Sequence, residues 1–220
     1  MTQGEFRLRS PALIVVDVQN YYLLPESDFQ RFHASLHPDS LDYIGERCRA
    51  TVLPNIARLL DEFRAKGLPV FFLRLCGVAA DRSDLHPFFR EAWSAGVAAG
   101  FPDVYPLAGS HMADVVTAIQ PAPGEVIFDK TTFSAFTAGD FADHLHAAAA
   151  RTLVFTGLAT SQCVDTTARD ASDRGFAVLH VPDAQADYSE EMHHAALYSS
   201  QGVCGGAFLN TTELTRHLGE

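Results

Sequence analysis

Three polar residues of the sequence have side chains suited to covalent chemistry, and they are Asp17, Lys130 and Cys163. Each follows a short apolar run, and these runs are residues 12–16, 125–128 and 152–156. A carboxylate can accept a thiol proton, an ammonium can hold the resulting charges in place, and a thiolate can attack a carbonyl carbon. Together these residue types form the parts of an acyl-transfer site.

Each of these residues also has an ordinary structural interpretation. Aspartate often caps turns, a lysine after a strand is often a solvated loop charge, and a free cysteine is usually buried. Two observations favour a catalytic role over a structural one for Lys130 and Cys163. Lys130 is one of only two lysines in a chain that otherwise uses arginine, and Cys163 falls in the first turn of an expected helix, where backbone N–H groups and the helix dipole favour a thiolate.

Apolar runs and stretches of helical periodicity alternate along the chain. Five runs are expected strands: residues 12–16, 69–73, 125–128, 152–156 and 176–181. Helical patterns precede the later four: residues 52–63, 115–119, 141–149 and 164–174. A sixth strand is expected around residues 206–209, followed by a helix from about Thr212. This order predicts an α/β fold, one doubly wound domain over residues 1–220, with a six-stranded, mainly parallel sheet covered by helices on both faces.

The strand order brings the three polar residues to one place, because the carboxyl ends of parallel strands meet at the same edge of a sheet. Two segments near that edge, residues 20–47 and 76–110, exceed the ordinary length of a loop. They are either surface insertions or the walls of a pocket.

Composition excludes several classes of function. The chain has 220 residues and a formal net charge of −11, which opposes binding to nucleic acid or to an anionic membrane surface. The apolar runs are too short to span a membrane and no signal peptide is visible, so the cytoplasm is the expected compartment. The four cysteines, Cys48, Cys76, Cys163 and Cys204, form no C-x-x-C pair, so neither a disulfide framework nor a zinc site is expected.

Three motifs give the sequence a family resemblance that covers nearly the whole chain. They are residues 13–19 (LIVVDVQ), 129–136 (DKTTFSAF) and 156–164 (TGLATSQCV). On these motifs the chain resembles the isochorismatase-like cysteine hydrolases, a superfamily that includes nicotinamidases, N-carbamoylsarcosine amidase, biuret hydrolase and ureidoacrylate amidohydrolase.

The resemblance implies a catalytic triad. Asp17 would take the thiol proton, Lys130 would orient the pair, and Cys163 would attack an amide, ureide or carbamoyl carbon to form a thioester, releasing ammonia or an amine. The backbone N–H groups of Ala159 and Cys163 would form the oxyanion hole. A cis peptide bond would join Leu158 to Ala159. A bell-shaped dependence of activity on pH would follow from such a coupled triad.

The resemblance also bears on cofactors, assembly and substrate. Nicotinamidases hold a metal through an Asp-x-His motif that residues 72–77 lack, so neither a metal nor another cofactor is expected. The family implies a homodimer or homotetramer. A small amide or ureide, including an anionic one, is the expected partner, and its candidate contacts are Gln19, Tyr22, Arg74, Phe133 and Phe136.

Three other functions stay open. The chain could be an isochorismatase-type hydrolase of a different metabolite, although isochorismatases themselves lack the cysteine. It could be a thiol redox sensor in which Cys163 is oxidised and Cys204 resolves the oxidised form. It could also be a binding protein that retains the fold without catalysis.

Overall fold

The computed structural model describes residues 8–137, 139–203 and 207–219. Within these residues a six-stranded sheet has the order β3-β2-β1-β4-β5-β6, and every neighbouring pair of strands is parallel. The strands are β1 (Pro11–Val16), β2 (Val70–Leu75), β3 (Val126–Lys130), β4 (Thr152–Leu158), β5 (Ala177–Ala186) and β6 (Ala207–Phe208). The predicted doubly wound parallel sheet is confirmed.

The central strands β1 and β4 are buried along their whole length. Their near-continuous apolar sequences follow from this, since helices cover both faces of a parallel sheet. The chain reverses its direction of winding between these two strands, because β2 and β3 lie on one side and β5 and β6 on the other. Ligands of open α/β sheets bind beyond the carboxyl ends of the strands at such a reversal.

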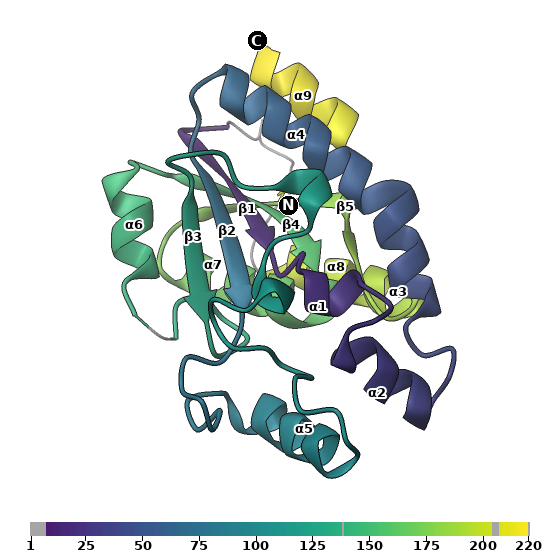
Figure 1. Ribbon diagram of the computed structural model, residues 1–220. Helices are drawn as coiled ribbons and strands as arrows, with labels where there is room; N and C mark the ends of the chain where they lie inside the picture. Colours follow the sequence, from purple (N-terminus) through teal and green to yellow (C-terminus); the bar gives the residue numbers. More distant parts are fainter. Residues whose placement is uncertain (1–7, 138, 204–206, 220) are drawn as a thin grey trace.

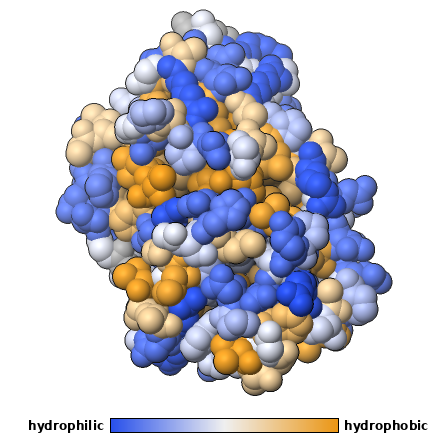
Figure 2. Space-filling view, viewed as in Figure 1, coloured by the Kyte–Doolittle hydropathy of each residue, from blue (hydrophilic) through white to orange (hydrophobic). Residues whose placement is uncertain are grey.

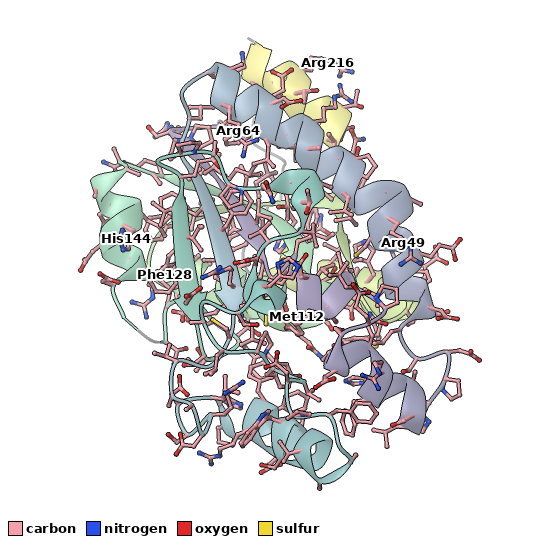
Figure 3. The ribbon with its side chains drawn as sticks, viewed as in Figure 1. Arg49, Arg64, Met112, Phe128, His144 and Arg216 are labelled. Carbon is pink, nitrogen blue, oxygen red and sulfur yellow. The ribbon has the colours of Figure 1, made fainter. Side chains whose placement is uncertain are left out.

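Helices cover the two faces of the sheet (Figure 1). One face carries α4 (Leu53–Ala65) and α9 (Thr211–Gly219), which pack on each other and on β5, and the other carries α7 (Asp165–Asp173) and α8 (Glu190–Val203). α6 (Phe141–Ala147) covers the β3 side, where Phe128 of β3 contacts His144 of α6 with ring centroids 6.1 Å apart (Figure 3). In α4, the spacing of buried Ile56, Leu59, Leu60 and Phe63 is that of an amphipathic helix.

The two long segments of the sequence contain helices joined by irregular stretches. The first contains α1 (Asn20–Leu23), α2 (Asp28–Leu36) and α3 (Asp42–Arg47), and a π-helical turn at Cys48–Val52 joins α3 to α4. The second contains α5 (Pro87–Ala98). Figure 1 shows α1, α2 and α5 beyond the carboxyl ends of β1, β2 and β3.

Some boundaries differ from those expected. β3 extends through Lys130, so this residue ends the strand instead of following it. The helix expected at residues 115–119 is only a short 3-10 turn, Thr117–Ile119, because Pro121 keeps the preceding residue extended. The sequence did not predict α8. Its buried positions include the polar residues His193 and Ser200, which interrupt the helical periodicity of apolar residues.

The surface is mixed in polarity. Figure 2 shows a band of apolar residues across the middle of one face, with hydrophilic residues above and below it. Among the described residues no helix is both long enough and apolar enough to cross a membrane.

Candidate active site

Asp17 directly follows β1 and has an unusual backbone conformation. Its φ angle is 52°, in the left-handed region that residues other than glycine seldom adopt. The Asp17 N–H donates to the carbonyl oxygen of Leu73 on the neighbouring β2 at 2.9 Å. Such strained residues persist where the surroundings hold them, often at functional sites. The side chain is almost entirely buried.

Lys130 ends β3 and is fully buried. Its Nζ lies 2.8 Å from Oδ2 of Asp17, and it donates to the carbonyl oxygen of Thr132 at 3.1 Å and to Sγ of Cys163 at 3.2 Å. These partners use all three N–H donors of an ammonium. Burial alone would lower the pKa of Lys130, but the charges of Asp17 and Cys163 outweigh it and the pKa is raised. Lys130 is therefore a fixed cation and not a base.

Cys163 lies in a π-helical turn, Thr160–Val164, between β4 and α7. Asp187, just past the end of β5, fixes this turn by accepting the Ser161 N–H at 2.6 Å. Thr167 of α7 donates its hydroxyl to the carbonyl oxygen of Cys163 at 2.6 Å. The backbone of this turn is thus held from both sides, at the edge of the sheet where Asp17 follows β1 and Lys130 ends β3.

A buried histidine supports the same turn from α8. Arg47 Nη2 donates to Nε2 of His193 at 3.1 Å, so Nδ1 carries the proton of the neutral ring and donates to Oγ1 of Thr160 at 2.8 Å. Burial, with a smaller contribution from the Arg47 charge, lowers the pKa of His193 to about 4. His193 is therefore a neutral structural link between α8 and the turn.

The ionisation of Cys163 depends on opposing effects of burial and neighbouring charges. Burial raises the pKa of the thiol, the Asp17 charge raises it further, and Lys130 only partly opposes them. The effect of a helix N-terminus is smaller than that of complete burial. Burial and the Asp17 charge therefore favour the protonated thiol, whereas Lys130 and the helix N-terminus favour the thiolate.

The carboxyl of Asp17 also has a shifted pKa. Burial raises this pKa and outweighs the lowering effect of Lys130. Oδ2 is engaged by Lys130, while Oδ1 is buried without a hydrogen-bond partner among the described residues. A carboxylate of raised pKa with a free oxygen is a better proton acceptor than an ordinary surface aspartate.

The peptide bond between Leu158 and Ala159 is trans, so the expected cis bond is wrong. Gly157 lies within β4 beside a shift in the register of its pairing with β5, and its φ of 101° is a conformation that only glycine adopts readily. Ala159 and Cys163 nevertheless line the same cavity.

That cavity lies at the carboxyl edge of the sheet and is small. Its volume is about 10 Å³, close to the room that one water molecule needs, so a substrate of several atoms requires its walls to move outward. Strand-end residues and both long segments contribute to the lining, which consists of Asp17, Tyr21, Tyr22, Leu75, Phe89, Tyr105, Leu158, Ala159, Gln162, Cys163 and Tyr188. Of the two interpretations of those segments, pocket walls are confirmed.

Of the candidate substrate contacts, only Tyr22 lines the cavity. Gln19 is buried beside it, where its amide donates to the carbonyl oxygens of Leu75 and Ala113 and accepts the Leu75 N–H, so it anchors the end of β2. Arg74 lies outside the cavity and forms a bidentate pair with Asp129 at 2.7 and 3.0 Å.

The other two aromatic candidates also lie outside the cavity. Phe133 packs behind the wall residue Phe89, with ring centroids 4.5 Å apart. Phe136 contacts Phe141 at 5.0 Å and lies under the Arg174 guanidinium at 4.9 Å. Cys204, the proposed resolving cysteine of a redox sensor, lies outside the described residues.

Sequence reasoning missed Tyr105, Gln162 and Tyr188 as lining residues. Tyr188 had a usable signal, because it follows the carboxyl end of β5, but the expected strand ended at residue 181 and the structure continues it to Ala186. Tyr105 comes from the irregular part of the second long segment and had no such signal. In the described parts of the chain no group of three or more His, Cys, Asp and Glu side chains is placed to hold a metal ion.

Comparison with known proteins identifies the family of the chain. The isochorismatase domain model matches residues 11–213. A ureidoacrylate amidohydrolase of Methylobacterium radiotolerans is 31% identical over 208 residues, covering 88% of this chain and 74% of that protein. Nicotinamidase 3 of Arabidopsis thaliana is 28% identical over 201 residues, covering 88% and 84%.

A solved structure of an isochorismatase family protein from Desulfovibrio vulgaris superposes with a TM-score of 0.77 at 25% identity, covering 96% of this chain and 100% of that one. The fold is thus that of a family of hydrolases with amidohydrolase members. The chain belongs to the isochorismatase family.

Proposed function

We propose that this protein hydrolyses the C–N bond of a small amide or ureide through a thioester on Cys163. The observation that carries the proposal is the position of the Lys130 ammonium, 2.8 Å from Asp17 and 3.2 Å from the Cys163 sulfur, beside a cavity that Asp17 and Cys163 both line. A base, a cation and a nucleophile share one substrate-facing spot, as covalent acyl transfer requires.

In the first half-reaction Asp17 takes the proton of the Cys163 thiol. The sulfur lone pair attacks the carbonyl carbon, and a tetrahedral oxyanion forms. The Ala159 and Cys163 N–H groups would stabilise this oxyanion. The oxyanion collapses as the C–N bond breaks, and the protonated Asp17 gives its proton to the leaving nitrogen, so ammonia or an amine departs and a thioester remains.

In the second half-reaction water attacks the thioester carbon while Asp17 accepts one of its protons. The C–S bond then breaks, the product leaves as the acid, and the proton returns to sulfur. Bonds and protons balance, and the net reaction consumes one water. Family membership and relatives named for amide hydrolysis support this proposal.

Lys130 has a specific electrostatic part in these steps. Before proton transfer it is paired with an ionised Asp17, and afterwards it is paired with the Cys163 thiolate, so the buried site keeps the same net charge in both states. Because changing the net charge of a buried site is expensive, this arrangement lowers the cost of moving the proton.

The redox-sensor alternative has less support. Peroxide reacts with exposed thiolates of low pKa, whereas Cys163 is 4% exposed and burial raises its pKa.

The test compares ammonia release from a panel of small amides and ureides by the wild-type protein, Cys163→Ala and the control Cys48→Ala. Cys48 is also a buried free cysteine, but it lies in the turn before α4. We expect Cys163→Ala to lose hydrolysis and Cys48→Ala to keep it, with an acyl adduct found by mass spectrometry on the Cys163 peptide. Equal rates in the wild type and Cys163→Ala would refute the proposal.

A further inference from the structure

We infer that the site selects electrically neutral amides over amides that carry a carboxylate, and that Tyr22 and Asp17 bind the polar edge of such a substrate. This inference rests on the proposed function. It goes beyond that function because it assigns the charge of the substrate and the side chains that form hydrogen bonds with its polar atoms.

The first argument is the distribution of charge around the cavity. Among the described lining residues the ionisable acid Asp17 faces the cavity, and no arginine, lysine or histidine does. The neighbouring cation, Lys130, already uses its three donors on Asp17, Thr132 and Cys163. A substrate carboxylate would lose its hydration here without gaining a free cationic partner.

A second cation near the site, Arg74, is also paired with carboxylates. Arg74, the sequence candidate for binding an anion, is held by Asp129 on one edge and contacts Asp114 at 3.1 Å. A second carboxylate, Asp187, is fully buried next to the turn Thr160–Val164 that carries Cys163. Neither Lys130 nor Arg74 is therefore free to pair with a substrate carboxylate.

The second argument is the nature of the walls. Four tyrosines and Phe89 supply the aromatic lining, and Tyr22 stacks on Phe29 with ring centroids 4.9 Å apart. Burial raises the pKa of Tyr22 well above its ordinary value and that of Tyr188 to about 12, so these hydroxyls stay neutral. Aromatic faces with neutral hydroxyls suit a flat, uncharged molecule.

The third argument is a pair of unsatisfied polar atoms. Oη of Tyr22 and Oδ1 of Asp17 are buried, and both side chains line the cavity. Neither atom forms a hydrogen bond of good geometry within the described residues, although the Tyr188 hydroxyl interacts with Tyr22 and the Cys163 thiol with Asp17. Buried polar groups normally have partners. An amide supplies both kinds of partner, since its N–H can donate to Asp17 and its polar edge can pair with the Tyr22 hydroxyl.

The test uses substrates with the same carbon skeleton and different charge: butyramide against succinamate, and 4-methylbenzamide against 4-carbamoylbenzoate. We expect the wild type to favour the neutral member of each pair by at least about tenfold in kcat/KM, mainly through KM. Preference for the carboxylate, or equal values, would overturn the inference and leave the proposed function standing. Absence of both hydrolysis and a Cys163 adduct across the whole panel of amides and ureides would remove the proposed function, and the inference with it.

One variant tests the Tyr22 hydroxyl, and a second, at Gln162, tests the selection by charge. Tyr22→Phe removes only the hydroxyl and should raise KM for butyramide roughly three- to tenfold, while the control Tyr198→Phe, at an 83% exposed position on α8, should have no effect. An unchanged KM in Tyr22→Phe would overturn the role of this hydroxyl.

Gln162 lines the cavity and is only partly buried, so a long side chain can be placed there. Gln162→Arg should shift selectivity toward succinamate by about tenfold relative to Gln162→Met, which has similar length without charge. The same ratio in both variants would show that charge does not govern selection and would overturn the inference.

Discussion

Gly157 of β4 lies so close to Val16 of β1 that a Cβ atom on Gly157 would fall 2.1 Å from the Val16 carbonyl oxygen. The two residues are register partners in the sheet. Val16 is followed directly by Asp17, and Gly157 is followed by the turn that carries Cys163. This close approach of two backbones therefore helps to set the separation between the proposed base and the proposed nucleophile.

Gly157→Ala should destabilise the protein and reduce its activity. The new methyl group meets backbone atoms that cannot rotate away, and φ at this position is 101°, so steric overlap adds to backbone strain. We expect a loss of about 3 kcal/mol or more in the free energy of unfolding, measured with urea.

Gly124→Ala is the matched control, because Gly124 has a φ of 91° and nothing within 4 Å of an added Cβ. It should lose only about 1 to 2 kcal/mol and keep its activity. If the two variants lose the same amount, the close contact with Val16 is not what requires glycine at position 157.

The sequence was sufficient to predict the sheet and the positions of Asp17, Lys130 and Cys163. Buried parallel strands are continuous apolar runs, and their carboxyl ends must meet at one edge whatever the details of packing. The contacts between the three side chains could not be read from the sequence, because they depend on register, such as the pairing of Leu75 with Lys130.

The substrate contacts were harder to predict for a similar reason. Arg74 has the residue type and the position of an anion-binding group, but Asp129 lies beside it in register and neutralises it. Tyr105 reaches the cavity only because of how residues 76–110 fold over the sheet edge. Side chains on irregular segments have no periodicity from which their direction can be predicted.

Asp17→Asn should lower the pKa of the Cys163 thiol while abolishing hydrolysis. The Asp17 carboxylate disfavours a nearby thiolate and Lys130 favours it, so removing the negative charge leaves the favourable term. Alkylation of Cys163 by iodoacetamide, followed by mass spectrometry at several pH values, should reach half its maximal rate at lower pH than in the wild type. A shift to higher pH would contradict the assigned electrostatics, and Cys76 serves as the internal control for general unfolding.

The dependence of kcat/KM on pH should be a bell with a displaced acid limb. Activity requires ionised Asp17, whose pKa burial raises above its ordinary value of 3.8, so the rate should still be rising above pH 3.8. The alkaline limb requires loss of the Lys130 proton, and the pKa of Lys130 is raised from 10.5, so no decline from this group is expected near pH 9. A profile that is flat from acid to base would rule out a coupled triad.

Lys130→Met should destabilise the fold by about 3 to 5 kcal/mol at neutral pH, because it leaves the buried Asp17 carboxylate without its cation. The loss should shrink as the pH falls, since protonation of Asp17 removes the unpaired charge. The double variant with Asp17→Asn should recover part of the stability, and a double-mutant cycle from urea unfolding gives the coupling energy. Strict additivity of the two substitutions would contradict the pairing.

Histidines buried as neutral rings should make the fold sensitive to acid. Burial is the largest cause that lowers the pKa of His180 from 6.5 to about 4, and the ring is held between Ser200 Oγ at 2.9 Å and Gln185 Nε2 at 3.3 Å. Between these two pH values the unfolded chain binds a proton that the folded chain does not. The stability from this group is therefore complete above pH 6.5 and is lost as the pH falls toward 4.

Each such proton changes the free energy of unfolding by at most about 1.4 kcal/mol per pH unit. Urea unfolding between pH 6.5 and 4.5 should show a shallower dependence on pH in His180→Asn than in the wild type. His194→Asn is the control, since the His194 side chain is 68% exposed and should leave the slope unchanged. Raised carboxyl pKa values such as that of Asp17 act in the opposite direction, but they are common to all three proteins and cancel in the comparison. Parallel slopes for His180→Asn and the wild type would show that His180 is already protonated in the folded state.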